Sequence, residues 1–208
     1  MLSSCALLLS PVLSSVSGAS TAVSGYISQN TTWTLASSPY VVTGNLTVHG
    51  GATLTIEAGV EVRFNSGVYL KTGYSTQTGY VRALGTPTQL VVFTSNQASQ
   101  ARGDWYGLWF GNNDGTARSL LEHTVVEYGG STNANIRSQS AFVDLNFVTV
   151  RESGQMGVWL DGGADLTVTD SVIEDNASRA IYVAEGDRLV VKDSTIRNNG
   201  AHGIYSAY

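Results

Sequence analysis

The chain has 208 residues, of which 42% are hydrophobic and only 13% are charged, and its formal net charge is -5. Two lysines, Lys71 and Lys192, and nine scattered arginines form no basic stripe, which argues against a nucleic-acid partner. No segment reaches the ~20 apolar residues of a membrane span, and Cys5 is the single cysteine, which excludes an intrachain disulfide.

Residues 1–19 have the character of a signal peptide. They carry no charged side chain, contain an apolar stretch at Cys5 to Leu9, and end in the small residues Ser17-Gly18-Ala19. We expect cleavage after Ala19 or close to it, which would leave residues 20–208 as one secreted or cell-surface domain. An alternative is a lipobox at Leu2-Ser3-Ser4-Cys5, which would make Cys5 a lipidation site but needs an apolar segment upstream.

The first half of the domain contains short segments in which apolar and polar residues alternate. Such alternation predicts strands, and their apolar members are Leu46 and Val48, Leu54 and Ile56, Val60, Val62 and Phe64, Val68 and Leu70, and Val91 and Phe93. Two polar stretches, Thr72 to Tyr80 and Ser95 to Asp104, interrupt the series. We expect them to leave the strands as loops.

From Val143 to the C-terminus the sequence repeats every 23 residues without a gap. The aligned triplets are Val150, Ile173 and Ile196; Val158, Ile181 and Ile204; and Gly157, Ala180 and Gly203. A period of this length indicates a solenoid whose units bury their apolar faces against each other. Strand alternation and β-branched residues within each unit predict an all-β, right-handed parallel β-helix of roughly eight coils, with about 23 residues in each regular coil.

Two further columns follow from the same register. Ser153, Asn176 and Asn199 fall at one corner, where stacked polar side chains can bond along the solenoid. The other column alternates in sign and reads Glu127, Arg151, Glu174 and Arg197. Because neighbouring coils lie about 4.8 Å apart, this alternation avoids like-charge repulsion, and we interpret it as structural.

Trp159, Tyr182 and Tyr205 form a third column, and they are the candidate ligand-binding residues. The residue before each of them is expected to face the core, so the three rings should face outward on consecutive coils. An exposed aromatic strip could lie along sugar rings or against a partner chain. The alternative is that the rings stack on one another and cover the wall of the solenoid.

The fold is also indicated by a family resemblance that covers about Gly25 to Tyr208. It is carried by these segments: Gly44 to Val48, Ala52 to Phe64, Ala83 to Thr86, Phe93 to Asn96 and Gly103 to Leu108. With these segments the chain resembles secreted right-handed parallel β-helix repeat proteins of the pectate-lyase-like superfamily. The resemblance implies the fold, but not an activity, since such β-helices include lyases, hydrolases, epimerases, adhesins and non-catalytic surface proteins.

A search for catalytic groups gives one cluster, Asp170, Lys192, Asp193 and Arg197, in which two stacked aspartates could pair or bind calcium. The alternative is that Asp170 and Asp193 are corner residues. The sequence does not contain the characteristic motifs of polygalacturonases in their order. The three histidines, His49, His123 and His202, fall on separate coils, and Asn112 to Gly115 is interpreted as a plain turn rather than a calcium loop. We therefore predict no metal and no cofactor, and the catalytic residues stay unknown.

The final repeat stops at Tyr208, four residues after Ile204, without a polar capping segment. We therefore expect either a fragment or an end that stacks on another molecule, which would form a filament. The predicted function is an extracellular structural or adhesive module that can assemble end to end, with itself, other surface proteins or neutral polysaccharide as partners. A carbohydrate-active enzyme or a glycan-binding module is the alternative.

Overall fold

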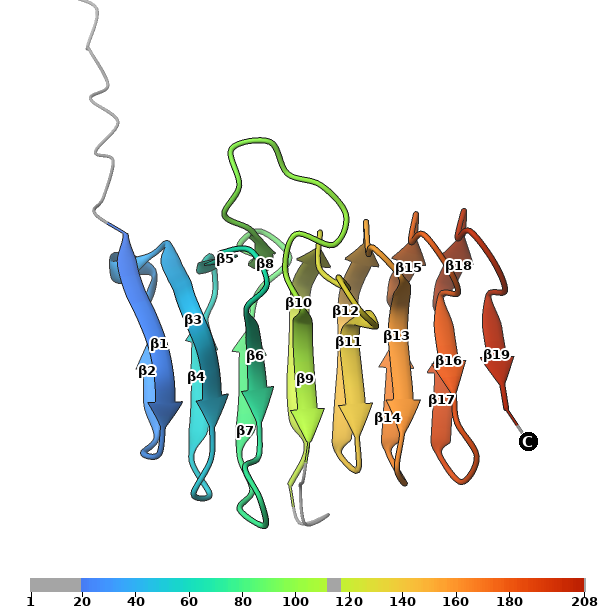
Figure 1. Cartoon of the computed structure of the whole chain (residues 1–208), viewed down its shortest axis with the longest axis horizontal. Helices are drawn as coiled ribbons and strands as arrows, with labels where there is room; N and C mark the ends of the chain where they lie inside the picture. Colours follow the sequence, from blue (N-terminus) through green and yellow to red (C-terminus); the bar gives the residue numbers. More distant parts are fainter. Residues whose placement is uncertain (1–19, 112–116, 208) are drawn as a thin grey trace, which may run out of the picture.

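The strands pair in parallel, each with a strand one coil away, and build a solenoid of about eight coils (Figure 1). The computed structural model describes residues 20–111 and 117–207. The predicted signal peptide with Cys5, the Asn112 to Gly115 turn and Tyr208 lie outside the described residues. In the described part, no helix is long and apolar enough to cross a membrane.

Three walls of laddered strands surround the core. Wall 1 contains β1 (Thr21–Ile27), β3 (Tyr40–Val48), β5 (Glu61–Phe64), β8 (Val91–Ser95), β10 (Ser119–Glu127), β12 (Phe142–Arg151), β15 (Val172–Glu174) and β18 (Thr195–Arg197). Wall 2 contains the second halves of β1 and β3, then β6 (Tyr69–Thr72), β9 (Gly107–Gly111), β11 (Ala134–Gln139), β13 (Met156–Asp161), β16 (Ile181–Val183) and β19 (Ile204–Ser206). Wall 3 contains β2 (Thr31–Trp33), β4 (Thr53–Glu57), β7 (Tyr80–Leu84), the first halves of β10 and β12, β14 (Asp165–Thr169) and β17 (Arg188–Lys192). One short 3-10 turn, η1 (Leu35–Ser37), joins β2 to β3.

The 23-residue register of the sequence is the register of the strands. Leu166 pairs with Leu189, Ile173 with Ile196, and Ile181 with Ile204. Leu166, Val168 and Ile173, which alternate with polar residues along their strands, are buried. The prediction of an all-β parallel β-helix of about eight coils is therefore confirmed.

The core is one continuous column of aliphatic and aromatic side chains. In its N-terminal half, Phe64 stacks on Trp105 with ring centroids 3.9 Å apart and planes 6° from parallel. Trp105 also donates an indole hydrogen bond of 2.9 Å to the carbonyl of Glu127, so that its buried polar edge is paired. The largest fully buried side chains, Trp105, Phe64, Phe93 and Phe110, all lie in this half. Its connections include the predicted loops, here residues 73–79 and 96–106 (Figure 1).

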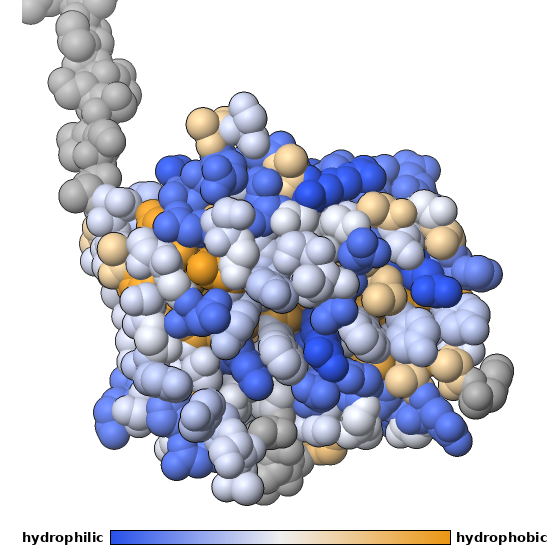
Figure 2. Space-filling model, viewed as in Figure 1, coloured by the Kyte–Doolittle hydropathy of each residue, from blue (hydrophilic) through white to orange (hydrophobic). Residues whose placement is uncertain are grey.

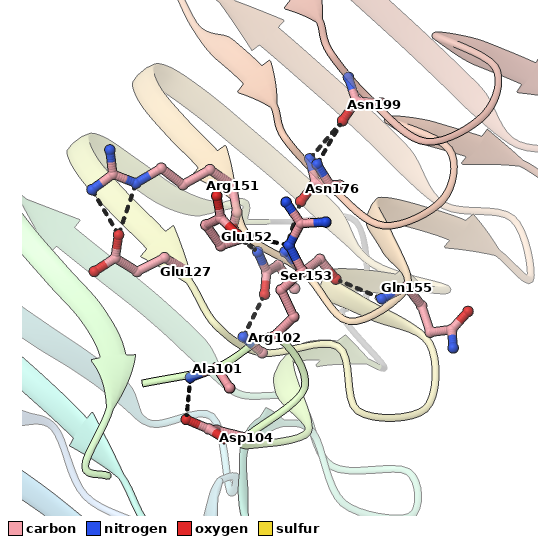
Figure 3. A network of polar contacts seen from close by, with 12 residues as sticks. Ala101, Arg102, Asp104, Glu127, Arg151, Glu152, Ser153, Gln155, Asn176 and Asn199 are labelled. Carbon is pink, nitrogen blue, oxygen red and sulfur yellow. Dashed lines mark hydrogen bonds and ion pairs between the residues drawn. The ribbon is translucent and has the colours of Figure 1, made fainter. Parts of the chain in front are cut away.

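The predicted polar ladder lies at the corner between walls 1 and 2 (Figure 3). The side chain of Asn176 accepts a hydrogen bond of 3.1 Å from the backbone of Ser153, and its amide group donates one of 2.9 Å to Asn199. Ser153 and Asn176 are buried. The ladder thus satisfies corner backbone groups that would otherwise be unpaired inside the protein.

Each regular coil also has residues in the left-handed conformation next to its corners. Glu152, Asp175 and Asn198 have φ of 53°, 53° and 54° at the corner that carries the ladder. At the corner between walls 3 and 1 the same role falls to Phe147 and Asp170, with φ of 55° and 50°. Asn and Asp tolerate this conformation well, whereas Glu and Phe adopt it at a cost.

The alternating charge column is confirmed as two ion pairs on the outside of wall 1. Arg151 is paired with Glu127 (Figure 3), and the pair measures 2.7 Å. Arg197 lies 2.7 Å from Glu174. Both arginine side chains are more than two-fifths exposed, at 44% and 59%. Exposed pairs contribute about 0 to 1 kcal/mol each, so the column mainly sets register.

Candidate functional site

The outer face of wall 2 carries a column in which aromatic and cationic side chains follow one another from coil to coil. Strand pairing places its members in direct succession: Lys71, Trp109, Arg137, Trp159, Tyr182 and Tyr205. We call these six residues the wall 2 strip. The structure brings together the three predicted residues, Trp159, Tyr182 and Tyr205, and extends their column by three coils toward the N-terminus.

Cations separate the rings in the N-terminal half of the strip. The ammonium of Lys71 lies 4.0 Å from the ring centroid of Trp109. The guanidinium of Arg137 lies between two indoles, 4.8 Å from Trp109 and 4.6 Å from Trp159. It also forms an ion pair of 2.6 Å with Asp161. Burial, helped by the charge of Arg137, lowers the pKa of Lys71.

In the C-terminal half of the strip the rings contact each other directly. Trp159 meets Tyr182 edge to face at 6.0 Å, and Tyr182 stacks on Tyr205 at 5.7 Å with planes 15° from parallel. Arg179 covers Tyr205 at 4.6 Å. Stacking between the rings is therefore present, as the alternative interpretation expected, and Tyr205 at the end of the strip is 37% exposed.

Two polar atoms beside the strip are buried without a hydrogen-bond partner among the described residues. They are the indole nitrogen of Trp159 and the Nε of Arg179. A buried donor left unpaired costs about 1–3 kcal/mol. Such donors are uncommon in native structures. Their position makes this half of the strip part of the candidate binding site.

A small hollow opens beside the N-terminal half of the strip. Its volume is about 50 Å³, and its lining includes Tyr69, Tyr106, Trp109, Asn133 and Arg137. Tyr69 meets both Tyr106 and Trp109 edge to face, at 6.2 and 6.3 Å. Tyr106 is 43% exposed. The hollow and the strip together form the candidate site.

One glycine lets the chain approach closely at the floor of this hollow. Gly107 has φ of 121°, and a Cβ there would collide with the carbonyl oxygen of Ala134. Any larger residue would therefore separate β9 from β11. The hollow could not be predicted from the sequence, because Tyr69 and Tyr106 lie before the regular repeats: the 73–79 loop follows the strand of Tyr69, and Tyr106 is the last residue of the 96–106 loop.

The face that carries the strip is turned toward the viewer in Figure 2. Side chains of intermediate hydropathy, drawn pale, are interleaved there with strongly hydrophilic ones. This mixture fits a surface on which rings alternate with charged groups, rather than an apolar patch of the kind that drives strong protein association.

The predicted catalytic cluster has the geometry of a corner. Asp170 and Asp193 both adopt the left-handed conformation, with φ of 50° and 48°. The serine that follows each aspartate bonds along the solenoid, since the backbone of Ser171 donates to the hydroxyl of Ser194 at 3.1 Å. Arg197 is paired with Glu174. This arrangement supports the corner interpretation.

Two carboxylates on the outside of wall 3, Asp144 and Asp165, are paired with arginines. Arg118 contacts Asp144 at 2.8 Å and Asp165 at 3.1 Å, and Arg188 contacts Asp165 at 2.9 Å. Burial would raise the pKa of Asp165, but the hydrogen bonds and charges of Arg188 and Arg118 outweigh it and hold that pKa below its ordinary value. A general acid needs the opposite shift.

The histidines occupy three separate places, as the sequence indicated. His49 is hydrogen-bonded to Gln77 at 2.7 Å, His123 stacks on Phe147 at 4.6 Å, and His202 lies 5.4 Å from the ring of Tyr205. Across residues 20–111 and 117–207 no group of three His, Cys, Asp or Glu side chains could hold a metal ion.

Fold and surface together define a parallel β-solenoid with an aromatic and cationic strip on one wall. Residues 25–158, well over half of the chain, match the family model of the pectate-lyase-like β-helix domain. The chain therefore belongs to this family. No curated protein and no solved structure matches it significantly.

Proposed function

We propose that the chain is an extracellular adhesive β-helix module that binds neutral polysaccharide along the wall 2 strip. The observation that carries the proposal is the unbroken succession of Trp109, Arg137, Trp159, Tyr182 and Tyr205 along one outer column. Tyrosine and tryptophan combine an apolar ring with a polar group, a combination suited to sugars, which have apolar faces and hydroxyl edges.

The length of the strip supports a polymeric ligand. Five steps of about 4.8 Å separate Lys71 from Tyr205, so the column extends for about 24 Å. A chain of several sugar units laid parallel to the solenoid axis could contact successive coils in the same way. A small molecule would use only one or two of them.

The charges of the strip favour a neutral ligand. Arg137 is neutralised by Asp161 and its guanidinium faces are covered by two indoles. Such a guanidinium keeps hydrogen bonding to hydroxyl groups but contributes little net potential to attract a polyanion. The net charge of -5 over the whole chain acts in the same direction.

The test is binding to a panel of neutral polysaccharides, measured by affinity electrophoresis and calorimetry. A Trp159→Ser/Tyr182→Ser double variant should lose at least tenfold in affinity if the rings contact the ligand. Tyr182→Phe keeps the stacking on Tyr205 and should bind nearly as well as the parent. Equal binding by the parent and by a folded double variant would remove the strip from the site.

Assembly of copies end to end is a second candidate, favoured by the state of the last coil. Its inward-facing side chains are less buried than those of the inner coils: Ile196 is only partly buried, and Ile204 is 48% exposed. The same inward column begins at Gly25 in the first coil, where no atom would lie within 4 Å of an added Cβ. A second copy stacked head to tail could therefore place Ile204 against a position that has room for it.

Such stacking would join walls 1 and 2 and leave a step at wall 3, because β17 lies one coil before β18 and β19. The occupant we propose for this end is a second copy of the chain. Negative-stain electron microscopy over a concentration series should show rods joined into filaments. Ile204→Asp should return them to single rods, and filaments that persist in this variant would count against the contact.

A further inference from the structure

The hollow beside Trp109 differs from the strip in shape. In the strip, rings and cations follow one another along an outer column, whereas the hollow is concave and its lining includes the aromatic residues Tyr69, Tyr106 and Trp109. Arg137 closes one side, and Thr132 and Asn133 lie on the loop side of its lining. It therefore offers one enclosed contact to a ligand that otherwise lies on an open surface.

The size of the hollow limits what can enter it. Pockets that enclose whole small molecules measure about 300–1,000 Å³, whereas this one measures about 50 Å³. A single water needs about 10–15 Å³ measured in the same way. A sugar ring is thus too large to be enclosed, while a substituent of a few heavy atoms fits.

The chemistry of the lining further limits which substituents the hollow can accept. Three aromatic rings favour an apolar end group such as a methyl, since a charged group would have to leave water for an apolar wall. Asn133 and Thr132 supply donors and acceptors nearby, which suits a carbonyl attached to that methyl. A free cation is disfavoured, because Arg137 and Lys71 already flank Trp109.

We infer that this hollow is a specificity subsite that takes the acetyl group of an acetylated sugar. The inference rests on the proposed function, because the subsite acts on a glycan that is also held by the strip. The polymer lies along wall 2, one of its units presents its acetyl methyl to the rings of Tyr69, Tyr106 and Trp109, and unacetylated units bind the strip without using the hollow.

The experiment compares neutral oligosaccharides that differ in acetylation. N-acetylated chitotetraose is measured against cellotetraose, and acetylated xylotetraose against its saponified form, all by calorimetry. Each acetylated member should bind about tenfold more tightly than its counterpart, the discrimination that a small apolar group gives in a fitted pocket. Preference in one pair alone would identify an amide-linked or an ester-linked acetyl group.

Three variants locate the effect. Tyr106→Ala should abolish the preference for the acetylated member, and Tyr106→Phe should retain it, since the ring and not the hydroxyl forms the wall. Phe147→Ala is the matched control: Phe147 is 49% exposed but lies at the corner between walls 3 and 1. It should leave both affinities unchanged.

The outcomes separate this inference from the proposed function. Equal affinity within both pairs, with binding still lost in the Trp159→Ser/Tyr182→Ser variant, would overturn the subsite and leave the strip as a binding surface. Preference for acetyl groups that survives Tyr106→Ala would also overturn it. If none of the four oligosaccharides bound, both the subsite and the polysaccharide-binding strip would be contradicted.

Discussion

The guanidinium of Arg137 lies 4.6 Å from the ring centroid of Trp159 on the next coil, and it is also held by Asp161 at 2.6 Å. A planar cation between stacked coils joins one aromatic side chain to the next while its Nε and Nη2 donate hydrogen bonds to Asp161. This contact links the two halves of the wall 2 strip. Both the stability of wall 2 and the proposed binding surface therefore depend on it.

Replacing Arg137 should weaken the fold measurably. Arg137→Ala removes two cation–π contacts and the ion pair with Asp161, whose carboxylate keeps the hydrogen bond from Gln139, and we expect a loss of about 1–2 kcal/mol in the free energy of unfolding. Arg137→Lys keeps the charge but not the planar group, so its free energy of unfolding should lie between those of the parent and of Arg137→Ala. Urea denaturation checks this, with Arg63→Ala, an exposed pair with Glu61, as the control that should change little.

The asparagine ladder should contribute more than any exposed ion pair. Asn176→Ala leaves the buried backbone N–H of Ser153 without its partner and also removes the bond to Asn199, so we expect a loss of about 2–3 kcal/mol. Asn199→Ala lies on the last coil, where water can replace the lost bonds, and should cost less. Equal losses in the two variants would contradict the role of burial in this ladder.

Much of this architecture could be predicted from the sequence, and the reason is periodicity. From Val143 onward each coil has the same length, so core, ladder and charge column follow by alignment. Arg137 could not be predicted as a member of the strip, because it lies 28 residues after Trp109 and 22 residues before Trp159. Unequal coils hide a column that strand pairing makes continuous.

The corners and the hollow depend on information that a single sequence holds only weakly. Glu152 and Phe147 adopt positive φ because the coil forces the corner, although their own side chains disfavour it. Tyr69 and Tyr106 become neighbours because loops of different length return the chain to the same wall. Tertiary context decides both features, and a local pattern cannot.

Substitutions at two glycines should distinguish the cost of backbone strain from the cost of a steric collision. Gly163 has φ of 84° with open space around an added Cβ, so Gly163→Ala should cost about 1–2 kcal/mol through conformation alone. Gly107→Ala adds a collision with the backbone of Ala134 and should cost more or prevent folding. Thermal unfolding of the two variants side by side measures the difference, and similar melting temperatures would contradict the close approach of β9 and β11.

Protonation of Asp165 in acid should lower the free energy of unfolding. Its pKa is lowered in the folded state by Arg188 and Arg118, so its contribution is fully present above the unfolded value of about 3.9 and is lost as the pH falls through the lower folded value. Asp165→Asn should remove this part of the pH dependence. Asp170→Asn, at a corner, is the control, and denaturant titrations between pH 7 and pH 2 make the comparison.

The most direct test of the account is hydroxyl-radical footprinting of the protein with and without a bound neutral polysaccharide. Protection should concentrate on Tyr106, Trp159, Tyr182 and Tyr205 of wall 2, while Phe147 and Tyr74 keep the reactivity they have in the free protein. Protection confined to the end coils or to the corners, with wall 2 unchanged, would contradict the claim that this wall is the binding surface.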